Sequence, residues 1–301
     1  MSQLQQDLTQ RRYVCKAFWI AIGLALTGLL MAGGCSSGDG TLTPTRVYQD
    51  SFDSEASLEN WVMEGPGVAT IDDGRLLLYS KWLPELESLE EENDVLGIQG
   101  DHYYRTIEQW VKEREPENLV KYLRDPENPS TFKGGHLQLW NKQVHPDNFL
   151  IRIKFQPANP NPLHMVTFAA LGVGGESIFD PKLASRFGIG GQYMSGDLTN
   201  YRISYWSGQR SSAHMRRAPG RQLTSQQNGD VPREALDSEV QLEIYGWQGR
   251  FVFKCDRETL IDWTDPEPLS GGYFSIRLML PAKGWYDDYE VYALNANPFE
   301  D

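Results

Sequence analysis

The sequence predicts an all-β fold in which two antiparallel sheets pack as a sandwich. Along most of the chain, hydrophobic and polar residues alternate, and Gly, Pro, Asn and Asp separate the alternating runs. This pattern is typical of half-buried strands. With 301 residues, of which 40% are hydrophobic and 23% charged, the chain can bury a large core. A dozen or more short strands in one domain favour two sheets packed face to face.

The clearest predicted strand covers residues 149–155. Its apolar side chains at alternate positions share one face, whereas Arg152 and Lys154 share the other. We therefore expect one face of this strand to lie on the core and the other to meet solvent. The same pattern predicts further strands at 47–52, 68–71, 75–79, 136–140, 165–171, 201–206, 213–217, 240–245, 250–255, 260–263, 273–280 and 289–294.

Residues 82–123 depart from this pattern and predict a helical insertion in the sandwich. The segment is rich in Glu, Leu and Lys, and Tyr104, Ile107, Trp110 and Val111 recur at three- and four-residue spacing. This spacing is typical of an amphipathic helix. The insertion is expected to be either a lid over a binding face or a decoration of the surface.

The N-terminus predicts export. Arg11, Arg12 and Lys16 precede an uncharged apolar segment at 17–32, which is shorter than the about 20 residues that a transmembrane helix needs and suits a secretory leader. Cys35 follows Ala, Gly and Gly, an arrangement that resembles a bacterial lipobox. The resemblance implies that Cys35 carries lipid and becomes the mature N-terminus; an uncleaved signal anchor is the alternative.

Three segments follow from this interpretation. Residues 1–34 are expected to form a lipoprotein signal peptide, residues 35–46 a tether, and residues 47–297 the sandwich domain. The lipid anchor is then the only membrane contact, on a periplasmic or cell-surface face of a bacterial membrane. Cys255 stays without a disulfide partner in the exported form and is predicted to be a buried thiol.

The net charge limits the partners of the chain. With 28 basic and 41 acidic residues, the formal net charge is −13. An acidic chain does not attract nucleic acid through its overall field, so we expect no nucleic-acid partner. We expect a monomer.

Several short motifs occur in order along the chain. They are 50–53 with Trp61, 73–76, 251–256 and 260–263. Together they resemble the concanavalin A-like lectin and glucanase superfamily. Within the chain, the segments 168–180, 191–193, 195–197, 200–205 and 215–217 resemble the YesU-like family, a domain of unknown function. The resemblance implies a jelly-roll sandwich and, by association, a role in bacterial carbohydrate metabolism.

Three predicted strands each present a polar and aromatic face. These faces carry Arg202, Ser204 and Trp206 on one strand, His214 and Arg216 on another, and His136, Gln138 and Trp140 on a third. If the three strands share a concave sheet, their faces form a groove suited to an anionic sugar, because guanidinium groups bind carboxylate and sulfate with paired hydrogen bonds. The alternative is that these side chains are satisfied sheet residues and a solvated edge.

The favoured hypothesis is a surface lipoprotein that acts on an anionic extracellular polysaccharide as a lyase or an unusual glycosidase. Elimination on a uronic acid needs a group that neutralises the carboxylate, a base and an acid. The catalytic candidates are His214, Arg216 and Tyr205. The substrate-binding candidates are His136, Gln138, Trp140, Arg202, Trp206, Arg217 and Tyr193. Alternatives are a non-catalytic carbohydrate-binding lipoprotein and a structural envelope protein.

No cofactor is required by this chemistry. Jelly rolls often hold a structural calcium ion, for which Asp53 and Asp288 are candidate ligands, although acidic turns also occur without metal. The sequence contains no zinc-type cluster of His or Cys, no P-loop and no dinucleotide-binding fingerprint.

Overall fold

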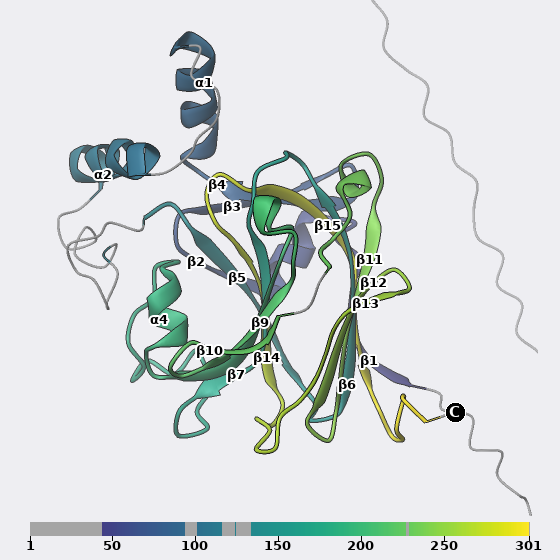
Figure 1. The fold of residues 1–301 in the computed structure, drawn as a ribbon. Helices are drawn as coiled ribbons and strands as arrows, with labels where there is room; N and C mark the ends of the chain where they lie inside the picture. Colours follow the sequence, from purple (N-terminus) through teal and green to yellow (C-terminus); the bar gives the residue numbers. More distant parts are fainter. Residues whose placement is uncertain (1–43, 94–100, 116–123, 125–133, 227–228, 301) are drawn as a thin grey trace, which may run out of the picture. The chain divides into compact units, whose positions relative to one another are not determined.

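The alternating pattern of the sequence produces strands along most of the described part of the chain (Figure 1). The computed structural model describes residues 44–93, 101–115, 124, 134–226 and 229–300. These residues belong to one compact unit, Leu42–Asp301. The predicted signal peptide, and Cys35 with most of the predicted tether, lie outside the described residues. Among the described residues, no helix has both the length and the apolar character needed to cross a membrane.

One sheet of the described structure has eight strands. Seven run in the order β13-β12-β11-β6-β15-β4-β3, and β1 pairs with β15 beside them. Their bounds are β1 Thr45–Asp50, β3 Gly67–Asp72, β4 Arg75–Ser80, β6 Phe149–Pro157, β11 Val240–Trp247, β12 Arg250–Cys255, β13 Glu258–Thr264 and β15 Lys283–Ala293. Every pairing in this sheet is antiparallel.

The other sheet of the described structure has seven strands, in the order β10-β9-β8-β7-β14-β5-β2. Their bounds are β2 Trp61–Glu64, β5 Leu137–His145, β7 His164–Gly172, β8 Leu198–Tyr205, β9 His214–Ala218, β10 Gln222–Gln226 and β14 Gly272–Leu278. Figure 1 shows the two sheets face to face. The sandwich predicted from the sequence is confirmed.

The main core lies between the sheets. Phe155, Phe168, Ile203, Leu242 and Ile276 are among its fully buried members. Along β6 and β11 buried and half-buried residues alternate, as expected for strands with one face on the core. The buried free thiol of Cys255 belongs to the same core, and burial raises its pKa to about 12.

The predicted helical insertion forms two helices among the described residues, α1 (Leu83–Asn93) and α2 (Asp101–Arg114). Their apolar faces meet around Trp82 and Trp110, whose ring centroids are 6.0 Å apart. The cluster also includes Ile107 and Val111, which the helical spacing had placed on one face, and Ile189. Part of the segment 82–123 lies outside the described residues.

The central strands of the seven-stranded sheet are buried on both faces. Nearly every residue of β7, β8 and β14 is buried. The outer face is covered by the loop between β7 and β8, residues 173–197, which we call the covering loop and which includes the short helix α4 (Gly190–Met194). In Figure 1, α4 lies on the outer side of this sheet. The polar residues that point outward from these strands are therefore enclosed.

Three short 3-10 helices complete the described secondary structure: η1 (Glu55–Asn60), η3 (Gly208–Arg210) and η4 (Arg233–Leu236). The helix η1 directly precedes β2 in the chain. A second 3-10 helix, η3, lies in the connection between β8 and β9. This second connection forms one rim of the candidate site.

Candidate functional site

Two rows of side chains cross the outer face of the seven-stranded sheet, because the strands pair in a fixed register. The first row follows Arg216, Arg202, Thr167, Ser275 and Trp140 from β9 to β5. The second row follows His214, Ser204, Met165, Arg277 and Gln138 across the same strands. Alternate residues of a strand point to one face, so both rows point away from the core.

A pocket of about 380 Å³ opens where these rows meet the covering loop. Five arginines line it, namely Arg202, Arg210, Arg216, Arg221 and Arg277. His136 and His214 also line this arginine pocket, together with Ser204, glycines and apolar side chains. Among the residues that the structure describes, no Asp or Glu lines the pocket. A chain with a net charge of −13 thus presents a concentrated positive charge at one place.

Arg202 is the most unusual member of the arginine pocket. Its side chain is only 7% exposed, yet its Nε and Nη2 groups have no hydrogen-bond partner among the described residues. Burial and the nearby charge of Arg277 lower the pKa of Arg202. A buried cation without an acidic partner is costly, so this guanidinium is suited to receive an anion from solution.

Arg277 lies beside Arg202 in the deep part of the pocket. It is 1% exposed, and its Nη1 group donates a hydrogen bond to the Gly188 carbonyl oxygen over 2.6 Å. The ring of Tyr193 faces both guanidinium groups, with its centroid 5.3 Å from Cζ of Arg277 and 5.9 Å from Cζ of Arg202. The aromatic face stabilises positive charge but does not neutralise it.

The arginines at the rim are held by neutral oxygens. Arg210 donates from Nη2 to the Ser204 hydroxyl over 3.0 Å and from Nε to the Ser212 carbonyl over 2.8 Å. Arg216 donates from Nη1 to the Arg221 carbonyl over 2.9 Å. These acceptors fix the direction of each guanidinium and leave its charge available to a ligand.

Two histidines complete the polar lining. His214 is half-buried, and its Nε2 lies 3.1 Å from the Ser212 hydroxyl. Partial burial and the charges of Arg210 and Arg216 lower its pKa from the usual 6.5, so His214 is neutral at pH 7 and can accept a proton. His136 accepts a hydrogen bond at Nδ1 from the Leu280 amide over 3.0 Å, which places its own proton on Nε2.

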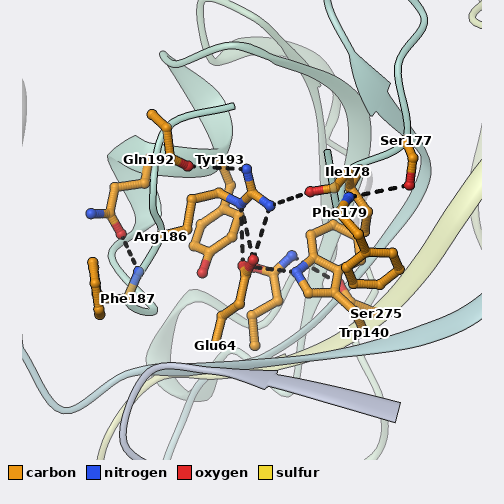
Figure 2. Close-up of polar contacts among 12 residues, drawn as sticks. Glu64, Trp140, Ser177, Ile178, Phe179, Arg186, Phe187, Gln192, Tyr193 and Ser275 are labelled. Carbon is orange, nitrogen blue, oxygen red and sulfur yellow. Dashed lines mark hydrogen bonds and ion pairs between the residues drawn. The ribbon is translucent and has the colours of Figure 1, made fainter. Parts of the chain in front are cut away.

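The covering loop is fastened to the sheet by a buried ion pair (Figure 2). Arg186 donates from Nη2 to Oε1 of Glu64 over 2.9 Å and to the Ile178 carbonyl over 2.6 Å. The side chains of Arg186 and Glu64 are 5% and 14% exposed. The indole of Trp140 donates to the other carboxylate oxygen of Glu64 over 2.9 Å. Glu64, on edge strand β2, therefore anchors the loop that forms one wall of the pocket.

Further contacts hold the part of the covering loop next to the arginines. Gln192 accepts hydrogen bonds at Oε1 from the amides of Phe187 and Ile189, and the Gly188 amide donates to the Tyr193 hydroxyl over 3.0 Å. Gly188 has a φ of +84°, and a Cβ there would come within 2.0 Å of the His136 carbonyl oxygen. Only glycine permits this close approach of the loop to the sheet.

Four of the predicted site residues meet in the arginine pocket. His136, Arg202, His214 and Arg216 all line it, as the alternation along their strands predicted. Gln138, Trp140 and Tyr193 lie on the same side of the sheet but are not among its lining residues. Gln138 donates to the Ser275 hydroxyl over 2.9 Å, and Trp140 packs on Tyr193 with centroids 6.2 Å apart. These three support the floor and the covering loop.

Three predicted residues lie elsewhere. Tyr205 points into the core between the sheets, where its ring packs on Phe155, because it has the opposite strand parity to Arg202. Trp206 leaves the outer face: its backbone turns, with a φ of 50°, and its ring joins the core. Arg217 also has the opposite parity and forms an ion pair with Asp265 at 3.3 Å. The expectation that these residues join the site is corrected.

The two acidic residues suggested for calcium each have a protein partner in the described structure. Asp53 accepts a hydrogen bond from the Ser51 hydroxyl, and Asp288 pairs with Lys154 at 2.8 Å. No group of three or more His, Cys, Asp or Glu side chains that could hold a metal occurs among the described residues.

Sequence reasoning missed Arg210, Arg221 and Arg277. The signal for Arg277 was present, because Ser275 and Arg277 share a face on an otherwise apolar strand. Arg210 and Arg221 lie in connections beside β9, where no periodicity predicts the direction of a side chain.

Comparisons with known proteins agree with this architecture. A family model described as "Domain of unknown function (DUF1961)" matches residues 102–291. The uncharacterized protein YesU of Bacillus subtilis (strain 168) is 27% identical over 169 residues, covering 52% of this chain and 77% of YesU. These matches confirm the resemblance to the YesU-like family.

Two solved structures are among those to which this chain is similar. A crystal structure of a protein of unknown function with galectin-like fold from Bacillus subtilis has a TM-score of 0.62 and 22% identity, over 84% of this chain and 98% of that chain. The κ-carrageenase of Pseudoalteromonas carrageenovora has a TM-score of 0.48 and 8% identity, over 87% of this chain and 100% of that chain. The first likeness confirms a sandwich of the galectin-like type. The family match covers more than half of the chain, and the chain belongs to the DUF1961 family.

Proposed function

We propose that the protein binds an acidic extracellular polysaccharide, with a carboxylate or sulfate group of the sugar held in the arginine pocket. The observation that carries the proposal is Arg202, a buried guanidinium with two donor groups left without partners. Guanidinium groups bind planar oxyanions through paired, charge-assisted hydrogen bonds. The enclosed floor and the aromatic Tyr193 beneath the cations supply the low dielectric in which such bonds are strong.

Binding measurements on paired variants test this proposal. We expect the protein to bind oligomers of a uronic acid or a sulfated sugar, and not neutral oligomers of the same length, in isothermal titration calorimetry. Arg202→Gln is expected to weaken binding at least about tenfold, since a hydrogen bond to a charged group contributes about 1.5–3 kcal/mol.

The matched control is Arg250→Gln on the other sheet. Arg250 pairs with Asp262 at 2.7 Å on the exposed surface, so its replacement removes the same charge from the chain but not from the pocket. Equal affinity of the wild type and Arg202→Gln for the acidic oligomers, with both variants folded, contradicts the proposal.

Cleavage by β-elimination is a second candidate, favoured by the neutral His214 beside the arginines. The arginines would neutralise the uronate carboxylate and so acidify the neighbouring C5–H bond. His214 would accept that proton as the C4–O bond breaks, the C4–C5 double bond forms, and the departing oxygen is protonated by water. Hydrolysis by two flanking carboxylates has less support, because no Asp or Glu of the described residues lines the pocket.

Ultraviolet absorbance of the unsaturated product distinguishes elimination from binding alone. Elimination requires unprotonated His214, whose pKa lies below 6.5, so turnover is expected to fall as the pH drops through that pKa. His214→Gln is expected to abolish turnover while binding persists. Tight binding by the wild type without any unsaturated product removes the enzyme candidate and leaves the binding function.

We also propose that the protein reaches the polysaccharide as an exported lipoprotein anchored through Cys35. The support is the leader and the lipobox-like sequence before Cys35. Incorporation of labelled palmitate into the wild type but not into Cys35→Ser is the expected result, and equal labelling of both chains contradicts it.

A further inference from the structure

The arginine pocket contains more positive charge than one acid group neutralises. Within the described part of the chain, five guanidinium groups line it and no carboxylate does. Among the described acids, Asp230 acts on the lining electrostatically: its charge offsets part of the lowering of the pKa of Arg210 and of His214. Its oxygens accept hydrogen bonds from the amides of Trp206 and Ser207 and from the Ser207 hydroxyl, so this carboxylate is already engaged outside the lining.

The cations form two sets at different depths. The deep set is Arg202 and Arg277, which are 7% and 1% exposed and share the face of Tyr193. The rim set is Arg210, which is exposed, and Arg216, which is half-buried. Arg202 and Arg216 are direct partners on β8 and β9, so their Cα atoms are about 5 Å apart. A single ligand can therefore reach both sets.

Uncharged oxygen atoms orient cations of both sets. The rim guanidiniums are held by hydroxyl and carbonyl oxygens, and Arg277 by the Gly188 carbonyl. Like charges at such short range repel one another, and after burial this repulsion contributes most to the lowered pKa of Arg202. For Arg210, burial lowers the pKa, Asp230 offsets part of that effect, and the charge of Arg216 lowers the pKa further. An anion bound at the deep set reduces the repulsion between Arg202 and Arg277 but leaves the rim cations without a counter-charge from the ligand.

A glycine keeps the deep set accessible. A Cβ added at Gly190 would lie 3.6 Å from Nη2 of Arg277 and 3.9 Å from Nη1 of Arg202. These are ordinary contact distances, so a small side chain fits here but occupies the space directly above both guanidiniums. Gly190 thus gives a way to block the deep set without removing a charge.

We infer that the pocket recognises a saccharide with at least two negatively charged groups, one bound by Arg202 and Arg277 and the second bound at the rim by Arg210 and Arg216. The inference rests on the proposed function and narrows its ligand. The two charges can belong to neighbouring uronate units or to one uronate unit that also carries sulfate, and both share the chemistry of paired oxyanions.

Calorimetric titration with a defined series of saccharides tests the inference. The probes are a monouronate, a diuronate, a monosulfated monouronate and a neutral disaccharide. We expect the ligands with two charges to bind at least about tenfold more tightly than the monouronate, because the second group gains its own charge-assisted hydrogen bonds. Which of the two doubly charged probes binds more tightly identifies the source of the second charge.

Variants of the two sets give the sharper readout. Arg216→Gln is expected to reduce the affinity for the doubly charged ligand by about tenfold and to change the affinity for the monouronate less than about threefold. Arg202→Gln is expected to reduce the affinity for both the monouronate and the doubly charged ligand. Gly190→Val retains all five positive charges, and its side chain occupies space beside both deep guanidiniums. It is expected to weaken the binding of both ligands as Arg202→Gln does, which shows that access to the deep set is needed as well as its charge.

The failures of the two claims are distinguishable. Equal affinities for the monouronate and both doubly charged ligands overturn the inference while the proposed function stands, as does an equal loss for mono- and doubly charged ligands in Arg216→Gln. Absence of binding to every acidic probe, or equal binding of the neutral disaccharide, overturns the proposed function itself.

Discussion

At the residue scale, the proposed site depends on a buried cation in the arginine pocket. Arg202 is enclosed by the sheet and the covering loop, and no ion pair with an acid joins it among the described residues. By contrast, Arg186 is similarly enclosed but is paired with Glu64. Two buried arginines on one sheet face thus have opposite environments: one fastens the loop, and the other is available for an anion.

This contrast predicts a gain in stability when the unpaired cation is removed. Arg202→Met has a similar length and no charge, and we expect it to raise the free energy of unfolding by about 1 kcal/mol or more, since apolar replacement of buried charge is often stabilising. Urea denaturation without ligand measures the change. Arg250→Met at the exposed surface pair serves as control and is expected to change stability by less than about 1 kcal/mol. A marked loss of stability in Arg202→Met contradicts the account.

At the scale of elements, the covering loop turns a sheet face into a pocket. It packs Ile178 and Tyr193 against outer residues of the sheet such as Trp140 and Leu198, and the ion pair between Arg186 and Glu64 ties it to edge strand β2. The polar rows of β7, β8 and β14 could be predicted from alternation along each strand. Their burial could not, because it depends on a loop whose path has no periodic signal.

The alternation of side chains along each strand explains which site residues could be predicted from the sequence. His214 and Arg216 follow from parity along a strand, and the register then brings them beside Arg202. Tyr205 has the opposite parity to Arg202, and the structure places it in the core and not in the predicted site. Trp206 has the right parity, but the strand ends at Tyr205 and the following residue turns inward.

Breaking the tie between loop and sheet is expected to destabilise the protein. Glu64→Gln leaves the buried Arg186 charge uncompensated, which costs about 3 kcal/mol. Asp262→Asn breaks a similar pair whose side chains are 42% and 40% exposed, and it is expected to cost less than about 1 kcal/mol. Urea denaturation compares the two, and hydrogen exchange at 186–194 shows whether the loop loosens. Equal small losses in both variants contradict the anchoring role of Glu64.

At the scale of the whole molecule, the sandwich follows from the hydrophobic pattern, and the interior holds polar groups that the pattern did not predict. Nδ1 of His164 lies 2.8 Å from the hydroxyl oxygen of Tyr286. Nε2 of His145 lies 2.7 Å from the hydroxyl oxygen of Tyr289. Both histidines belong to the space between the sheets, and burial lowers the pKa of each to about 3.

These buried histidines predict a loss of stability in acid. Between about pH 6.5 and pH 3, the unfolded chain binds protons at both positions and the folded chain does not, so stability falls as the pH falls. Each histidine contributes about 1.4 kcal/mol per pH unit over that interval. Well above pH 6.5 both histidines are neutral in the folded and in the unfolded chain, so they cause no loss of stability there. His164→Gln is expected to reduce the slope of unfolding free energy against pH, and titration of both histidines near pH 6.5 in NMR spectra of the folded protein contradicts the assignment.

The most direct test of the central claim is a crystal structure of the protein with an acidic oligosaccharide bound. The account predicts a carboxylate or sulfate group at hydrogen-bond distance, about 3 Å, from the guanidinium of Arg202 in the arginine pocket. An oligosaccharide bound with its acid groups away from Arg202, or found only on another surface, contradicts it.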